Sequence, residues 1–196
     1  MINDAIAMIA ECPQCGAPVK LNSNVCEFCG SEYLIQTLKG LNGFDKKGID
    51  KYIANYRKLS AENPANPEIN SAIGICYLKL GLYDFAYKYF EKAMEDMIEN
   101  SDLYFYSAVC ILKGKRPFLV PLTLIRKSEE FLDAAKNLNS SDGKYAYAHA
   151  LIKYDYYYKK RLNTDPNFQE LLNEAEHCGI CQDDKQLVEN LLKLSF

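Results

Sequence analysis

Two closely spaced cysteine pairs near the N-terminus restrict the possible folds of this chain more than any other feature. They are Cys12-Pro-Gln-Cys15-Gly16 and Cys26-Glu-Phe-Cys29-Gly30, with residues 16–25 between the second and third cysteine. Two residues between paired cysteines let both thiolates reach one ion from a tight turn, and the following glycine permits the positive φ that closes it. This spacing indicates a tetrahedral site of four thiolates, a ligand set typical of zinc.

The same residues resemble the zinc-ribbon family, whose members often begin CPxCGxP and end CxxCG. The resemblance covers about residues 11–33 and implies that Cys12, Cys15, Cys26 and Cys29 are the four metal ligands. Between the pairs we expect a short strand, a polar turn and a second short strand, with Pro18 at an edge. Four thiolates leave no open coordination position, so the zinc is predicted to be structural rather than catalytic.

The cellular compartment affects how these cysteines are interpreted. The first ten residues lack the basic stretch of a secretory signal, and the apolar run 117–125 is too short to span a membrane and contains two prolines. We therefore expect a cytoplasmic protein without a membrane partner. Paired cysteines there indicate metal or redox chemistry. Two disulfides, or iron in a rubredoxin-like site, are the alternatives for the same four residues.

Charge is distributed unevenly along the 196 residues, whose formal net charge is −3. Residues 1–44 hold four acids and two bases, residues 45–161 fifteen and nineteen, and residues 162–196 seven and two. The few bases near the cysteines disfavour phosphate binding there, and nucleic acid is not the expected partner. The basic middle either attracts the acidic end of the same chain or faces an acidic partner.

From about residue 44 the apolar residues follow a helical period, beginning with Ile49, Tyr52, Ile53, Tyr56 and Leu59. The segment 67–100 indicates two antiparallel helices with a turn at Gly81. It resembles the tetratricopeptide repeat (TPR) family in its pattern of small and aromatic residues. The matching positions are Gly74, Tyr77, Gly81, Tyr83, Ala86, Phe90 and Ala93.

The repeat pattern is weaker on both sides of this segment. Residues 31–65 look like a degenerate first repeat, and an insert at 115–121 interrupts the next one, whose second helix resumes with Ser128, Leu132 and Ala135. A long helix is expected over 145–161, and Pro166 is placed just inside the next one. A last amphipathic helix, at about 183–195, is expected to cap the array.

The predicted architecture is therefore mainly α. It combines a TPR-like α-α superhelix at 34–196 with a small N-terminal β zinc ribbon at 1–33. In the TPR family, ligands lie in a concave groove lined by the first helix of each pair. The resemblance and the insert together imply a partner-binding surface formed by Ile75, Leu78, Lys79, Phe105, Val109, Leu112, Arg116 and Phe118.

TPR members that bind a peptide carboxylate use lysine, arginine and asparagine in this groove, and Ser71 and Ile75 replace two of them here. The expected ligand is therefore an apolar helix or an extended peptide of another protein. The insert offers exposed apolar residues within a basic rim, so it either forms a contact site or folds back onto the helices.

Other reactive residues have structural interpretations. The pair Cys178 and Cys181 fits a helix end with Gly179 in the left-handed region, and a metal half-site or redox pair is the alternative. Cys76 and Cys110 are expected to be buried in the core, and His149 to be a packed or partly exposed helix residue rather than a base. We find no glycine-rich phosphate loop and no nucleophile–base pair in the sequence, so the chain is predicted not to be an enzyme.

These patterns predict an adaptor or scaffold that binds another protein and carries a structural zinc ion. The alternative is a nucleic-acid-associated factor that uses the ribbon and the stretch from Tyr154 to Arg161, where aromatic rings adjoin cations. Within that stretch, Tyr154 and Tyr158 are expected to be buried, and Tyr156 and Tyr157 to be exposed.

Overall fold

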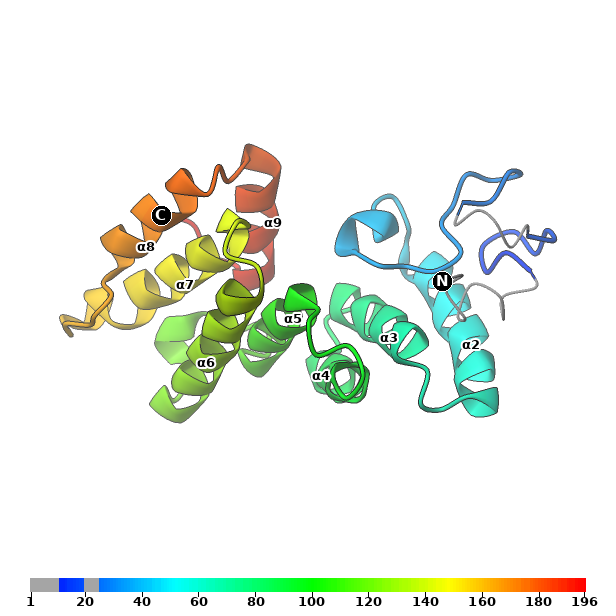
Figure 1. Cartoon of the computed structure of the whole chain (residues 1–196), viewed down its shortest axis with the longest axis horizontal. Helices are drawn as coiled ribbons and strands as arrows, with labels where there is room; N and C mark the ends of the chain where they lie inside the picture. Colours follow the sequence, from blue (N-terminus) through cyan, green and yellow to red (C-terminus); the bar gives the residue numbers. More distant parts are fainter. Residues whose placement is uncertain (1–10, 20–24) are drawn as a thin grey trace. The chain divides into compact units, whose positions relative to one another are not determined.

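The computed structural model of the chain describes residues 11–19 and 25–196. Within these residues the chain has eight α-helices and three short 3-10 helices, and its β pairing is limited to two isolated bridges. The predicted mainly-α fold is confirmed. The chain divides into two compact units, Met1–Met97 and Ile98–Phe196, and the domain boundary expected after residue 33 stays a prediction (Figure 1).

The first unit contains the cysteine pairs and the first helices. Its elements are η1 (Leu38–Leu41), α2 (Lys46–Glu62), α3 (Pro67–Lys79) and α4 (Tyr83–Met94). Helix α3 packs against both α2 and α4. Asn66 caps α3, where its side chain accepts a hydrogen bond from the Ile69 N–H, and Pro67 occupies the first turn, which needs no N–H donor.

Helices α3 and α4 form the predicted helix–turn–helix. Gly81 joins them with a φ of +71°, as a tight turn requires. A Cβ atom at Gly74 would lie 2.5 Å from Cε1 of Phe90, so only glycine lets this ring pack against α3. Ala86, Phe90 and Ala93 are fully buried on α4. The small-and-aromatic pattern therefore reports a real close approach of two helices.

The expected first repeat at 31–65 is only partly present. Its second helix exists as α2, which buries Tyr52 and Tyr56, but its first helix is replaced by an irregular segment and the short η1. Three consecutive buried residues, Tyr33–Ile35, have no helical period. Gly40 and Gly43 further disfavour a helix there.

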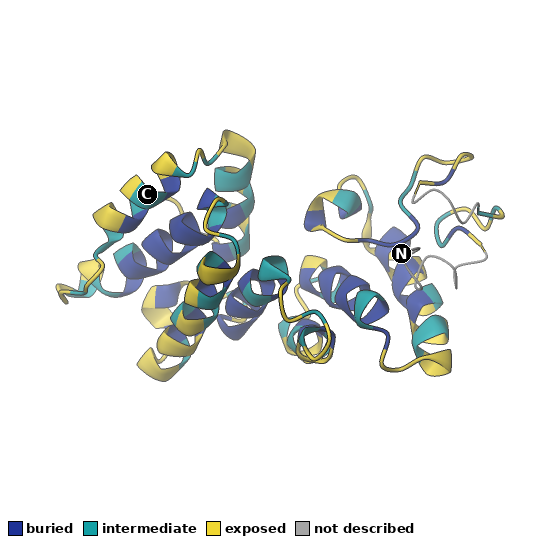
Figure 2. Ribbon diagram, viewed as in Figure 1, coloured by how far each residue is buried: buried dark blue, intermediate teal, exposed yellow. Residues whose placement is uncertain are grey.

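The second unit contains two helix pairs and a final helix. Its elements are α5 (Ser101–Ile111), η2 (Pro117–Leu119), α6 (Leu122–Leu138), α7 (Gly143–Tyr156), η3 (Tyr158–Lys160), α8 (Phe168–His177) and α9 (Gln182–Leu192). Helix α5 pairs with α6 and α7 with α8, while α9 packs on α7. Almost the whole of α7 is buried, so it forms the centre of this unit (Figure 2).

Two expectations about α7 and α8 were wrong. The helix predicted over 145–161 ends at Tyr156 and is followed by the short 3-10 helix η3, so the tyrosines that face solvent differ from those expected. Tyr156 is buried, whereas Tyr158 is 58% exposed and stacks on Tyr154. Pro166 lies before α8 rather than inside it, because Asn167 is the N-cap and forms a capping box with Glu170.

Within the described residues we find no helix that is both long enough and apolar enough to cross a membrane.

Candidate functional site

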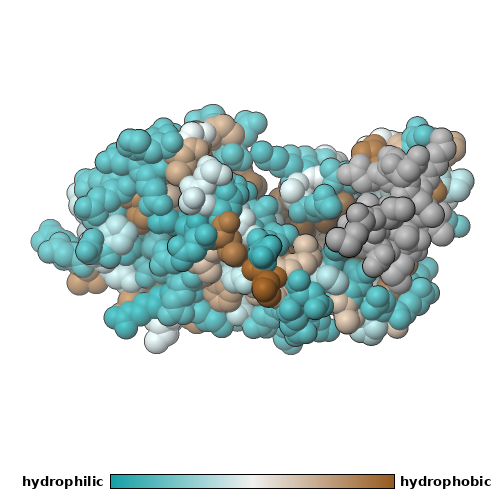
Figure 3. All heavy atoms as spheres, in the orientation of Figure 1, coloured by the Kyte–Doolittle hydropathy of each residue, from teal (hydrophilic) through white to brown (hydrophobic). Residues whose placement is uncertain are grey.

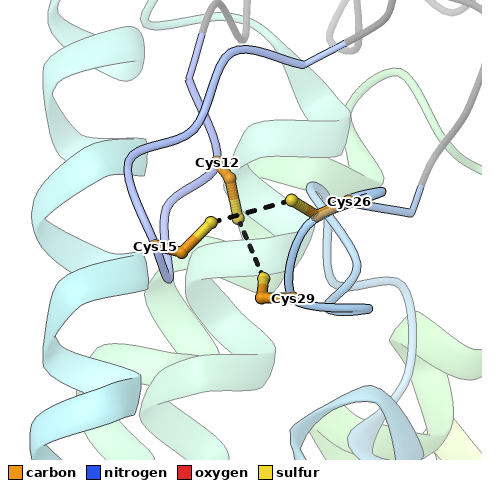
Figure 4. A group of neighbouring side chains, drawn as sticks. All are labelled: Cys12, Cys15, Cys26 and Cys29. Carbon is orange, nitrogen blue, oxygen red and sulfur yellow. Dashed lines mark hydrogen bonds between the residues drawn. The ribbon is translucent and has the colours of Figure 1, made fainter.

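The four cysteines predicted to bind metal lie together. All four sulfur atoms are within 4.8 Å of one another (Figure 4). Cys12 Sγ is 3.6 Å from Cys29 Sγ, and Cys15 Sγ is 3.7 Å from Cys26 Sγ, so neither distance is that of a disulfide. Zinc–sulfur bonds of about 2.3 Å in a regular tetrahedron place the sulfur atoms about 3.8 Å apart. The donor set and its spacing therefore fit one tetrahedral ion.

Each cysteine pair forms the same local turn. In the first, the Cys12 N–H donates to Ala17 O and the Gly16 N–H to Cys12 O; in the second, the Cys26 N–H donates to Ser31 O and the Gly30 N–H to Cys26 O. Gly16 has a φ of +74° and Gly30 of +71°, as the sequence predicts. Both turns follow from the same five-residue pattern, which explains why they present their thiols equivalently.

The predicted strands around these turns are not present in the described residues. Each isolated bridge closes one turn, Glu11 with Pro18 and Val25 with Glu32, and none pairs one turn with the other. The N–H groups of Cys12, Gly16, Cys26 and Gly30 donate within the two turns, so they are not available to pair strands. The expected polar turn at 20–24 lies outside the described residues.

The segment after the second turn is attached to α2 by two tyrosines. Tyr52 OH donates to Glu32 O at 2.9 Å, and Tyr56 OH donates to Tyr33 O at 2.8 Å. The Ile35 N–H in turn donates to Tyr56 OH. Sequence reasoning assigned both tyrosines to an apolar helix face and missed these hydroxyl contacts, which hold the cysteine turns against the helix.

The thiols differ in acidity when no ion is bound. Burial raises the pKa of Cys12 to about 12, whereas hydrogen bonding from Ser31 lowers the pKa of Cys29 to about 6. A metal ion binds thiolates, so binding releases the proton of Cys12. Hydrogen bonding from Ser31 thus favours the thiolate form of Cys29, which is the form that binds a metal ion.

The predicted partner-binding surface is mostly buried. Five of its side chains are at most 3% exposed and fill the spaces between helices, namely Ile75, Leu78, Phe105, Val109 and Leu112. Lys79, Arg116 and Phe118 are exposed. Three of the eight residues belong to the first unit and five to the second, so the groove as a whole stays a prediction. Only the exposed residues present their side chains to solvent.

Asp155 on α7 holds the insert in place. Its side chain is fully buried and accepts from Arg116 Nη2, from the Phe118 N–H at 2.9 Å and from Lys159 Nζ at 2.8 Å. The insert therefore folds back onto the helices, one of the two expected outcomes. Even so, Phe118 is 42% and Leu119 70% exposed. The single acid within a run of aromatic residues was the sequence signal for this anchor.

The remaining cysteines have structural roles. Gly179 has a φ of +70°, and the Ile180 N–H donates to Ala175 O, so Cys178 stands at the C-terminal end of α8 as expected. The Cys178 thiol contacts Ser140 O, and the exposed Cys181 thiol contacts Asp184. Cys76 and Cys110 are buried in α3 and α5, which confirms their placement in the core.

His149 is packed between α6 and α7, as expected. It is 2% exposed, with Nε2 3.4 Å from Glu129 and Nδ1 3.4 Å from Asp133. Lys153 Nζ and Tyr157 OH also contact Glu129. Burial by itself lowers the pKa of His149, but the two carboxylates raise it above its ordinary value, and His149 lowers the pKa of Asp133.

This raised pKa predicts a pH-dependent stability. His149 binds a proton more tightly in the folded chain, so its contribution is fully present below its unfolded pKa of about 6.5 and is lost as pH rises through the folded value. We expect the stability difference between the wild-type chain and His149→Gln to shrink as pH rises above about 6.5. Urea unfolding across a pH series measures it. A difference that stays constant or grows with pH would contradict this assignment.

Paired helices and a four-cysteine cluster together define a TPR-like helical protein with a candidate metal centre. Two solved structures of MamA, a TPR-like all-α protein, have a similar fold. "Crystal structure of MamA" aligns with a TM-score of 0.57 and 17% identity, covering 76% of this chain and 82% of that one. "MamA RS-1 ArsTM double mutant" gives 0.56 and 13%, covering 72% and 70%. At these identities the likeness concerns the fold alone.

No family model matches the sequence, and no curated protein matches it.

Proposed function

We propose that this protein is a non-catalytic adaptor that binds another protein, and that its cysteine cluster holds a structural zinc ion. The observation that carries the adaptor function is the insert, where Phe118 and Leu119 are exposed on a segment anchored by the buried Asp155. Fixed apolar side chains favour binding, because little conformational freedom is lost when a partner docks. The paired helices supply the rigid support.

Zinc is the metal that the donor set favours. Four thiolates at tetrahedral spacing are typical of structural zinc sites, which are coordinatively closed. The cluster connects two turns with few apolar contacts of their own, where metal binding replaces a hydrophobic core. The zinc-ribbon resemblance of residues 11–33 agrees with this role. The proposal places the chain in the cytoplasm, where thiols stay reduced.

The reactive side chains of the described residues support a non-catalytic role. Both ring nitrogens of the buried His149 face carboxylates, so the ring is engaged in the helix interface rather than directed at a substrate. Cys76 and Cys110 are buried. The four clustered thiols would be occupied by zinc.

Affinity capture with matched baits tests the adaptor function. We expect a stoichiometric protein partner on the wild-type chain and its loss on the double variant Phe118→Ser, Leu119→Ser, which changes the two exposed apolar residues of the insert. Ile98→Ser is the control, because Ile98 is an exposed apolar residue of the same unit that lies outside the insert. The absence of any partner, or equal retention by all three baits, would count against the proposal.

A second candidate function is nucleic-acid binding through the end of α7. Tyr158 is exposed, and Arg161 follows it at the surface. Lys159, however, pairs with Asp155, and the Lys160 ammonium lies 3.5 Å from the Tyr156 ring centroid, so both cations already have partners. This candidate predicts salt-dependent RNA retention that weakens when Lys159, Lys160 and Arg161 become alanine. Flat titrations at low salt would eliminate it.

A further inference from the structure

A polar cavity of about 520 Å³ lies in the second unit, next to the anchored insert. Its wall combines Arg116 of the insert segment, Lys159 of η3, and residues of α9 and of the segment that follows it. Besides Leu194 and the hydroxyl-bearing Ser195, the side chains that line it are charged or amide groups, namely Arg116, Lys159, Gln186, Glu189, Asn190 and Lys193. Three of these six are cations and two are neutral amides.

The cavity keeps a positive surplus after its internal pairs are counted. Asp155 is buried against Arg116 and Lys159. The single acid of the wall, Glu189, accepts from Tyr147 OH at 2.7 Å. Three cations therefore face two carboxylates that are already engaged. Lys193 is the left-handed C-cap residue of α9, and its ammonium forms an ion pair with neither Asp155 nor Glu189.

The chain around the cavity is also cationic. Residues 113–127 contain five bases and no acid, and residues 156–164 contain three bases and no acid, although the whole chain has a net charge of −3. Such a local excess attracts anionic groups and orients them. The charge asymmetry therefore points to a ligand with several carboxylates rather than to a neutral peptide.

Exposed apolar side chains stand beside these cations. Phe118 and Leu119 lie on η2, separated from Arg116 only by the buried Pro117, and Lys160 Nζ lies 4.9 Å from the Phe118 ring centroid. The face shown in Figure 3 is mostly hydrophilic, with small apolar patches. A ligand bound at the insert thus meets cations and apolar groups within a few residues of each other.

We infer that this face takes an acidic peptide segment of a partner protein, with the carboxylates in the cavity of Arg116, Lys159 and Lys193 and an apolar side chain against Phe118 and Leu119. The inference rests on the proposed adaptor function and names its partner class. Recognition of this kind uses charge to position the peptide and apolar contact to hold it.

An extended peptide suits the face better than an anionic membrane. Helix α9, which forms one wall, also carries Asp183, Asp184 and Glu189. A flat anionic bilayer would lie against these acids as well as against the cations, whereas a peptide can follow the cationic strip alone. The fold-back of the insert supports the same choice, because Arg116 and Lys159 line a cavity instead of standing free around the apolar residues.

Selection of short peptides from a random phage-displayed library on the full-length zinc-loaded chain tests the inference. We expect the enriched peptides to combine Asp or Glu with Phe, Leu or Trp. A synthetic peptide of the most enriched sequence should bind about tenfold more weakly to Leu119→Ser and to Lys193→Asn. Both variants should fold, because Leu119 is 70% exposed and asparagine tolerates the φ of +53° at Lys193. The matched controls are Ile98→Ser and Lys47→Asn.

Each other outcome is decisive. If the enriched peptides lack acids, or bind the two variants as tightly as the wild type, the inference is overturned while an adaptor with another docking face survives. If no peptide is enriched, the inference fails, and affinity capture judges the adaptor function separately. Binding to phosphatidylserine vesicles or to RNA that is stronger than peptide binding and is lost in the same two variants would overturn the peptide assignment.

Discussion

Replacing Cys26 with serine is expected to abolish metal binding and to unfold the two cysteine turns. Cys26 is 1% exposed, and its sulfur atom lies within 4.8 Å of the sulfur atoms of the other three cysteines. Metal binding stabilises isolated zinc modules by an apparent ~10–16 kcal/mol at neutral pH, which is more than the remaining contacts of two short turns supply. Elemental analysis should fall from one zinc per chain to none, and hydrogen exchange over residues 11–19 and 25–35 should become fast.

The control for this variant is Cys181→Ser. Cys181 is exposed and lies outside the cluster, and its thiol contacts the carboxylate of Asp184. The control should keep its zinc and its exchange protection. If the Cys26 variant keeps one zinc per chain, or loses it with exchange unchanged, the cluster does not have the structural role assigned to it.

The effect should extend from the turns into the first helix of the unit. The Tyr52 and Tyr56 hydroxyls donate to the backbone of Glu32 and Tyr33, so loss of the turns leaves two buried phenol groups without acceptors. A buried donor that loses its partner costs about 1–3 kcal/mol. We therefore expect the amides of α2 to lose protection from hydrogen exchange together with those of the cysteine turns. Metal binding would then contribute to the stability of the whole first unit.

The cysteine cluster was predictable because its geometry is local. Each Cys-x-x-Cys-Gly pattern specifies one turn by its own backbone, and the glycines at 16 and 30 adopt the positive φ that the turn needs. The helix pair at 67–100 was predictable for a similar reason, since a glycine at 74 and an aromatic ring at 90 are the residues that a close approach of two helices requires. Both predictions rest on residues that lie close together in the sequence.

What sequence reasoning missed depends on contacts between distant segments. The burial of Phe105 and Val109 arises because α5 packs on α6, and a repeat pattern alone does not show which helix faces remain exposed. The exposure of Tyr158 follows from where α7 ends, and helix ends are weakly encoded. Asp155 binds Arg116, which lies 39 positions before it in the chain, a pairing that no local pattern reveals.

Replacing Asp155 with asparagine is expected to release the insert from α7 and to destabilise the second unit by about 2–3 kcal/mol. The amide keeps the shape of the side chain but removes the charge that binds Arg116 and Lys159. This loss of stability is smaller than for a fully buried ion pair. The side chains of Arg116 and Lys159 are 49% and 32% exposed, so water can solvate them when the carboxylate is removed. Urea unfolding measures the loss, and faster tryptic cleavage after Lys115 reports the released insert.

The pH dependence of this loss distinguishes the ion cluster from simple packing. Burial alone raises the pKa of Asp155, but hydrogen bonds from Lys159, the Phe118 N–H and Arg116 hold it below its ordinary value. The stabilisation is therefore present above the unfolded pKa of about 3.9 and is lost as pH falls through the folded value. The difference between Asp155→Asn and the wild type should shrink in acid, while Asp183→Asn, an exposed control on α9, should leave both stability and cleavage unchanged. An Asp155→Asn loss of the same size at acid and neutral pH would instead assign the anchor to packing, because a lost charge cannot matter once the native carboxyl is protonated.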